Sequence, residues 1–195
     1  MQLGDVAQIK TGLVLTRKKA EIEYKAKVTY NLLSLRNISE DGMFEDESFD
    51  EFNSNDYLDE HYFTKEGDVL FRLSQPYTAV FIDKNHTNLL VPSYFAIIKV
   101  DETKVLPQFI AWFLNTSSVK KELERAQAGT RIPSTNQQTL RSIPIELPTL
   151  SKQKQLIELY ELHQKKQMLY KKLIQENEIY FRGVAQKILG GNEND

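Results

Sequence analysis

The feature that most constrains the fold is a long C-terminal run of residues that favour helix. From Ser151 to Leu189 the sequence contains no proline and one glycine, Gly183, and it is dense in leucine, lysine, glutamine and glutamate. All four of these residue types have high helix propensity. At ~1.5 Å per residue such a helix would extend roughly 50–60 Å. We therefore expect a globular domain over residues 1–149, a long helix over 150–189 and a disordered tail over 190–195.

The apolar residues of this run predict a contact with another chain. They recur three, four or seven positions apart, at Leu159, Leu162, Leu169, Leu173 and Tyr180. This spacing places them along one side of a helix, in a stripe that Lys166 and Glu176 interrupt. A globular domain at one end cannot cover the whole stripe, so a coiled coil with another chain is favoured over packing against the chain's own globular domain. His163 and Asn177, at the margin of the stripe, would help to set the register.

The residues before the run predict a single core of mixed α and β structure. With 195 residues, of which 41% are hydrophobic, the chain can bury one good core but not two full domains. Apolar and β-branched runs predict strands over 28–35, 67–71, 78–82 and 94–100. Turn-forming clusters over 74–77 and 83–86 separate the last three. Neighbouring strands would then pair in a meander that forms a β-sheet or an open barrel.

Helices are expected to flank this sheet. After Pro107, apolar residues recur at helical spacing as far as Leu123, with a cap at Ser117-Ser118 between two helices and Gly129 at the end of the second. Trp112 and its aromatic neighbours belong to this pattern, so we expect them in the core rather than in a base-stacking platform. A polar loop over 129–136 and an extended segment over 143–148 would follow. The predicted fold class is α+β.

Composition limits the compartment and the kinds of site. The chain has no cysteine, which excludes a disulfide framework and a thiolate metal site and fits a reducing cytoplasm. The opening MQLGDVAQIK has no apolar core of signal-peptide length, and no stretch approaches roughly eighteen consecutive apolar residues. We expect a soluble, unprocessed cytoplasmic protein with no membrane partner.

The net charge of −2 hides an uneven distribution along the chain. Residues 40–60 contain acidic side chains and no lysine or arginine, whereas the remainder is mildly basic. This acidic block is expected to be a solvated loop that faces away from any phosphate backbone, or else a surface for a protein partner. A nucleic-acid-binding face elsewhere on the molecule is therefore compatible with the overall acidity.

The sequence does not predict catalysis by this chain. It has no Pro-Pro pair and no G-x-G loop, both of which an adenine methyltransferase would need, and it contains neither a P-loop nor a serine-nucleophile motif. His61, His86 and His163 lack metal-ligand spacing, so no metal or cofactor is expected. A remaining alternative is a Mg²⁺-dependent nuclease that uses Asp5, Glu23 and Lys25, because Glu23-Tyr-Lys25 has the E-x-K spacing.

Groups suited to binding DNA occur in separate clusters. The basic run Thr16-Arg-Lys-Lys19 could neutralise phosphates, although a solvated charge run is equally compatible with it. Arginine and glutamine can read guanine and adenine in the major groove, which makes the turn after the second predicted strand a candidate reader. It contains Arg72, Ser74, Gln75, Tyr77 and Thr78. The polar loop adds Thr130, Arg131, Ser134 and Asn136, with a purely structural turn as the alternative in both places.

Several stretches together resemble the specificity subunits of type I restriction-modification enzymes. They are Leu3–Gly12, Tyr30–Ile38, Glu66–Phe71 (similar to the family's "KGDVL" strand), Phe109–Asn115 with Ala128–Arg131, and Leu140–Gln155, LRSIPIELPTLSKQKQ. The last is similar to the passage that leads into the family's long helix. Two departures are Arg72–Tyr77, where the family often has a Ser/Gly-rich turn, and a length sufficient for one recognition domain and one long helix instead of two.

The resemblance implies a non-catalytic, half-length specificity subunit. It would read double-stranded DNA, pair with its own copy through the long helix, and direct a methyltransferase subunit, with a restriction subunit where one is present, to a bipartite site. Arg36, in the stretch that follows the first variable loop, is a further candidate DNA contact. The full set of candidates is Thr16, Arg17, Lys18, Lys19, Arg36, Arg72, Ser74, Gln75, Tyr77, Thr78, Thr130, Arg131, Ser134 and Asn136. The main alternative is a coiled-coil adaptor that binds proteins and reads no DNA.

Overall fold

The computed structural model describes residues 1–20, 26–45, 47–126 and 134–190. It separates into two compact units, Met1–Lys154 and Gln155–Asp195. The first unit contains strands and short helices, and the second is the continuation of one long helix. The predicted α+β class with a long C-terminal helix is therefore confirmed.

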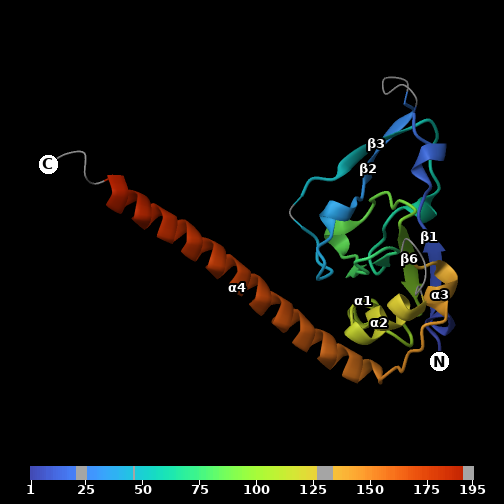
Figure 1. The fold of residues 1–195 in the computed structure, drawn as a ribbon. Coiled ribbons are helices and arrows are strands. Elements are labelled where there is room, and N and C mark those ends of the chain that lie inside the picture. The colour runs from blue at the N-terminus through green and yellow to red at the C-terminus, as the bar shows by residue number, and fades with distance from the viewer. Residues whose placement is uncertain (21–25, 46, 127–133, 191–195) are drawn as a thin grey trace. The chain divides into compact units, whose positions relative to one another are not determined.

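The main sheet has four strands in the order β1-β6-β4-β5, and all of its neighbours are antiparallel. The strands are β1 (Ala7–Thr11), β4 (Val69–Arg72), β5 (Ala79–Phe81) and β6 (Phe95–Val100). The expected meander is correct for β4 and β5 but wrong for β6, which lies between β4 and β1 (Figure 1). Phe95 to Ile98 are all buried, so both faces of β6 are covered, which is typical of a strand in the interior of a sheet.

A second sheet pairs β2 (Val28–Leu32) with β3 (Asp50–Ser54). The strand predicted over 28–35 ends early because Ser34 caps a short helical turn, Leu35–Asn37: its backbone N–H donates to Asn37 Oδ1 at 2.8 Å. Strand β3 lies inside the acidic block, so the expectation of a loop there is wrong. Phe52 is buried while Glu51 is exposed, which gives the block a strand with one covered face. Among the described residues both sheets are open, so the sheet is confirmed over the barrel.

Three helices accompany the main sheet. Helix α1 (Pro107–Leu114) contacts β4 and β5, α2 (Ser117–Ala126) contacts α1, and α3 (Gln137–Arg141) contacts β1 (Figure 1). Phe109 and Ile110 of α1 are buried and Trp112 is partly buried, as the helical spacing predicted. Helix α3 was not predicted; it begins where the predicted polar loop over 129–136 ends, and Asn136 caps it by accepting the Thr139 N–H at 3.0 Å. Gly129, the predicted end of α2, lies outside the described residues.

A tight turn over residues 38–44 is fixed against the main sheet. Ile38 and Phe44 form an antiparallel bridge and pack on the core cluster that contains Leu70 and Phe95. Gly42 has a φ of +77°, and a Cβ on it would lie 2.3 Å from the Ala79 carbonyl oxygen. The turn therefore depends on a glycine at this position.

We expect Gly42→Ala to destabilise the globular unit by about 2 kcal/mol or more, because a side chain at positive φ is strained and the clash is with backbone. Urea unfolding would measure the loss. Gly183→Ala is the matched control, since nothing lies within 4 Å of the Cβ it would add. That change should stabilise its helix by up to ~1 kcal/mol. A Gly42→Ala protein as stable as wild type would contradict this description of the turn.

The long helix α4 spans Leu150–Gly190. Its first residues, 150–154, belong to the globular unit. Gln153 is fully buried there: its Oε1 accepts the Leu106 N–H at 2.8 Å and its Nε2 donates to the Pro148 carbonyl at 2.8 Å. Farther along, the side chains of the predicted stripe are all exposed, from 57% for Leu169 to 71% for Tyr180. No described helix is long and apolar enough to cross a membrane.

Candidate nucleic-acid interface

The turn between β4 and β5 brings several predicted DNA contacts together. Ser74 bridges to Ser134, and the Thr135 N–H donates to the Leu73 carbonyl at 2.7 Å. This pairing joins the β4–β5 hairpin to the segment that leads into α3. Gln75, Ser134 and Asn136 are exposed, and Arg72 and Ser74 are partly so. The structure thus assembles one polar surface from Arg72, Ser74, Gln75 and Ser134, which we call the hairpin surface.

Arg72 is the one charged residue in this surface. Its Nη2 donates to the Gln75 carbonyl at 3.1 Å, which holds the guanidinium beside the turn. Its Nε is buried and has no hydrogen-bond partner among the described residues. A guanidinium held at one nitrogen keeps other donors for a ligand, and its planar fork matches the O6 and N7 acceptors of guanine.

Tyr77 and Thr78 take a different position from the one their polarity suggested. Their exposed fractions are 2% and 4%, the Tyr77 ring stacks on Phe71, and the Thr78 hydroxyl donates to the Pro76 carbonyl at 3.3 Å. Burial raises the pKa of the Tyr77 hydroxyl. In this conformation neither side chain reaches a base edge, because both are directed into the protein.

The basic run lies on a second surface, at the end of the β2–β3 sheet. Thr16, Arg17 and Lys19 are exposed, and Lys19 bridges to Ser54 at the end of β3. Lys18 Nζ lies 2.8 Å from the Asp56 carboxylate. That hydrogen bond, together with the positive charge of Lys18, lowers the pKa of Asp56.

Sequence reasoning missed two residues near the basic run, Lys27 and Tyr57. Together with Lys18 and Lys19 they form what we call the lysine surface. The Nζ of Lys27 lies 5.6 Å from the centroid of the Tyr57 ring, and Tyr57 is 75% exposed. Lys27 also contributes to the lowered pKa of Asp56, so the two lysines flank one carboxylate. An exposed aromatic ring beside lysines is suited to contact a nucleic-acid backbone or base. A tyrosine immediately after an aspartate in an acidic block gave no signal of this arrangement.

Arg36 occupies a third place. Its Nη2 lies 2.5 Å from Asp50 and its Nε lies 3.8 Å from Glu47. Lys18 and Arg36 are therefore both paired with carboxylates of residues 40–60. The expectation that the acidic block lies apart from the predicted DNA contacts is wrong, because its side chains are the counter-ions of two of them. A phosphate would have to replace Asp50 or Asp56 to use these cations.

Other predicted residues are not placed. Thr130 and Arg131, and Glu23 and Lys25 of the nuclease hypothesis, lie outside the described residues. The Asp5 carboxylate accepts the Gln2 N–H at 2.8 Å and closes a short helical turn. Within the described ranges, no group of histidine, aspartate and glutamate is arranged to hold a metal ion. The nuclease hypothesis therefore gains no support.

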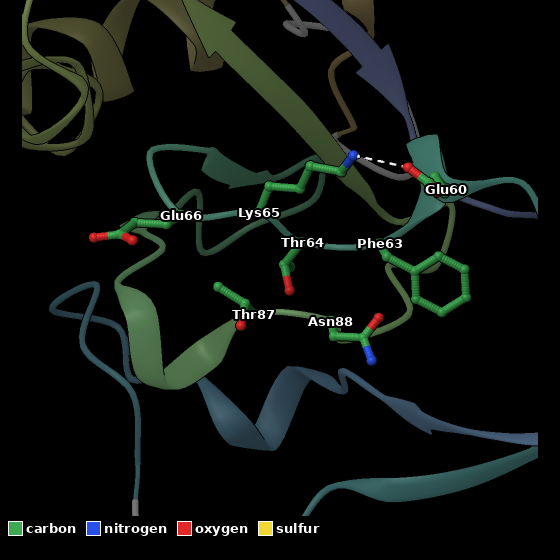
Figure 2. A pocket seen from close by; sticks show the side chains of 7 residues that line it. All are labelled: Glu60, Phe63, Thr64, Lys65, Glu66, Thr87 and Asn88. Carbon is green, nitrogen blue, oxygen red and sulfur yellow. Dashed lines mark hydrogen bonds and ion pairs between the residues drawn. The ribbon is translucent and has the colours of Figure 1, made fainter.

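A pocket of about 360 Å³ lies elsewhere on the globular unit. It is lined by Glu60, Phe63, Thr64, Lys65, Glu66, Thr87 and Asn88, none of which is a predicted DNA contact. Figure 2 shows Lys65 reaching toward Glu60, 3.0 Å away, while Glu66 points away from them. The Thr64 hydroxyl donates to the His86 carbonyl and accepts the Leu89 N–H. The side chains of Lys65, Glu60 and Thr64 are thus bonded to other groups of the protein.

Comparison with known proteins identifies one family. The family model described as type I restriction modification DNA specificity domain matches residues 1–179. Comparison with curated protein sequences gives no match.

Three similar solved structures come from type I systems. A chain from a study of complex assembly and conformational transition of the type I R-M system is 15% identical with a TM-score of 0.72. The HsdS subunit from Thermoanaerobacter tengcongensis is 16% identical with a TM-score of 0.68. The S subunit from M. genitalium is 12% identical with a TM-score of 0.56. The matches cover 100%, 100% and 99% of this chain but 50%, 50% and 46% of the others, so it spans about half their length.

Proposed function

The chain belongs to the type I restriction modification DNA specificity domain family, and from that premise we propose that it selects the DNA sequence on which a methyltransferase subunit acts. It performs no chemistry itself. The observation that carries the proposal is the hairpin surface, where Arg72, Gln75 and Ser134 present unlike polar groups from the β4–β5 hairpin and from the segment bridged to it. Loops held by a rigid scaffold are common sites of recognition.

The proposal assigns different tasks to the two surfaces. The hairpin surface reads base edges, because arginine and glutamine offer donors and acceptors at fixed positions. The lysine surface, Lys18, Lys19, Lys27 and Tyr57, contacts the phosphate backbone without regard to sequence. Arg36 contributes to backbone contact once Asp50 is displaced. Thr130 and Arg131 remain predicted contacts.

The half length of the chain suggests an assembly of two copies. The exposed stripe Leu159, Leu162, Leu169, Leu173 and Tyr180 on α4 supplies an apolar seam for a second α4. If the two helices pair antiparallel, a twofold axis relates the two globular units, and the recognised site is an inverted repeat with a fixed spacer. The paired helices also form a platform for methyltransferase subunits, and for a restriction subunit where the system has one. This assembly acts in the cytoplasm.

The salt dependence of DNA binding tests the proposal. Binding that releases counterions weakens linearly on a log–log plot against salt, with a slope that counts phosphate contacts. We expect Lys18→Ala with Lys19→Ala to reduce that slope by about 1–2 and to weaken binding to all sequences similarly. Lys121→Ala, an exposed lysine on α2, is the control for loss of charge. A double variant with an unchanged slope would remove the lysine surface from the interface.

A protein-interaction adaptor is the second candidate. It is favoured by the ion pairs of Lys18 and Arg36, which already neutralise two of the predicted DNA contacts, and by the exposed apolar stripe on α4. The same titration distinguishes the two functions. An adaptor would show weak DNA binding without sequence preference, whereas a specificity subunit would retain a preferred sequence at a salt concentration that abolishes nonspecific binding.

A further inference from the structure

A small pocket places an acidic residue beside Arg72. The pocket has a volume of about 10 Å³ and is lined by Leu35, Ile38, Ser39, Glu40, Arg72, Thr78 and Phe95. Arg72 and Glu40 are its charged members, and they come from the β4–β5 hairpin and from the turn over residues 38–44. The hairpin surface thus has a second element next to it, contributed by the start of the acidic block.

Glu40 differs from the other carboxylates near predicted DNA contacts. Asp56 and Asp50 form ion pairs with Lys18 and Arg36, whereas no described ion pair joins Glu40 to Arg72. Glu40 is exposed, and Arg72 is partly exposed with only its Nη2 hydrogen-bonded among the described residues; its Nε is buried and out of reach of a ligand. Both residues therefore retain hydrogen-bonding capacity for an external ligand.

The turn that carries Glu40 is held in one conformation. The Ser39 N–H donates to the Met43 carbonyl at 2.9 Å, and the Gly42 N–H donates to the Ser39 carbonyl at 3.0 Å. Gly42 abuts Ala79 of β5, whose N–H and carbonyl both bond to the Asn115 side chain, at 2.9 and 2.7 Å. The backbone at Glu40 is thus fixed relative to the strand that follows the hairpin, while its side chain is exposed. A fixed backbone limits the positions that the carboxylate can take, which reduces the entropy lost on recognition.

The two charges together select against phosphate and for a base pair. A carboxylate on a residue that lines the same small pocket as Arg72 repels phosphate, which disfavours Arg72 as a simple contact to the DNA backbone. In the major groove a G·C pair presents the O6 and N7 acceptors of guanine and the N4 amino donor of cytosine. An arginine matches the first and a glutamate matches the second.

We propose that Glu40 is a specificity-determining residue that accepts a hydrogen bond from the cytosine N4 of the base pair whose guanine is read by Arg72. This inference rests on the proposed DNA-reading function. An A·T or T·A pair in either orientation would face Arg72 and Glu40 with fewer matching groups. A reversed C·G pair would direct the O6 acceptor at the carboxylate, which leaves a desolvated and repelled charge.

The test is selection of bound sequences from a randomised double-stranded DNA library by wild type, Glu40→Ala, Arg72→Ala and the double variant. Wild type should require G·C at one position, and Glu40→Ala should relax that same position by roughly five- to a hundredfold, the range for one base contact. The double variant should lose little more than Arg72→Ala alone, because the two residues read one base pair. Glu51→Gln removes an exposed carboxylate of β3 and should leave every position unchanged.

The outcomes separate this inference from the function on which it rests. If wild type enriches no sequence, the proposed DNA-reading function is wrong. If wild type enriches a sequence and Glu40→Ala enriches the same one with equal stringency, only the assignment of Glu40 is overturned. The assignment would also be overturned if Glu40→Ala changed the preference at a position that Arg72→Ala leaves unaffected, because it requires both residues to read the same base pair. Because Glu40 is exposed, circular dichroism of the variant should match wild type.

Discussion

Arg72→Ala is expected to change which DNA sequence the protein prefers, with a smaller effect on its affinity for unrelated DNA. Loss of one bidentate base contact removes ~1–3 kcal/mol of discrimination at one position. Phosphate contacts from the lysine surface would remain, so nonspecific affinity should persist. Competition between the preferred site and sites with single base-pair changes measures the effect. The position read by Arg72 should become nearly indifferent to base identity while the others stay selective.

Arg72→Lys separates the shape of the side chain from its charge. Lysine keeps the positive charge but loses the planar fork, so it should restore nonspecific affinity without restoring discrimination. The Nη2 bond to the Gln75 carbonyl also supports the turn, and thermal unfolding of each variant would show whether the hairpin is intact. If Arg72→Ala weakened binding to all sequences equally in a folded protein, the division between base and phosphate contacts would be wrong.

Leu169→Glu combined with Leu173→Glu should convert a dimer of this chain to a monomer. Both leucines are mostly exposed on α4, and burial of such a side chain contributes ~1.5–3 kcal/mol. The double change removes that contribution from each copy and places carboxylates in the seam, so the dimer dissociation constant should rise by about a hundredfold or more. Sedimentation equilibrium at several concentrations would measure it.

A change elsewhere on the same helix serves as the control. Met168 is 56% exposed but is rotated about 100° from Leu169 around the helix axis, away from the stripe. Met168→Glu with Gln175→Glu therefore adds the same charge outside the seam and should leave the dimer intact. Survival of the dimer in the Leu169 and Leu173 variant, or its loss in the control, would place the contact on another face.

The parts of the fold that were predictable are those with a strong local pattern. The apolar runs of β4, β5 and β6 and the helix formers of α4 specify their own structure. Strands β1 and β3 were not predicted. Strand β1 is short and has one fully buried residue, Ile9, and in β3 the acidic residues around Phe52 obscured its apolar pattern. The position of β6 between β1 and β4 arises from pairing between distant segments, which one sequence does not reveal.

The chemical types in the candidate site were predictable, but their partners were not. Basic and polar residues marked Lys18, Arg36 and Arg72 as possible contacts. The carboxylates that pair with Lys18 and Arg36 lie 38 and 14 positions away, so sequence spacing gave no indication of them. The burial of Tyr77 likewise depends on its packing against Phe71. The sequence shows which side chains are basic, and only the fold shows which of them are already paired with a carboxylate.

The most direct test of the central claim is detection of methylated bases across the genome of cells that express this chain with a type I methyltransferase subunit, compared with cells that lack the chain. The proposal predicts a new adenine methylation motif that is split by a fixed spacer, is an inverted repeat, and depends on the chain. The inverted repeat would support two copies as well as DNA specificity. Methylation that is the same with and without the chain would contradict the claim and favour the adaptor function.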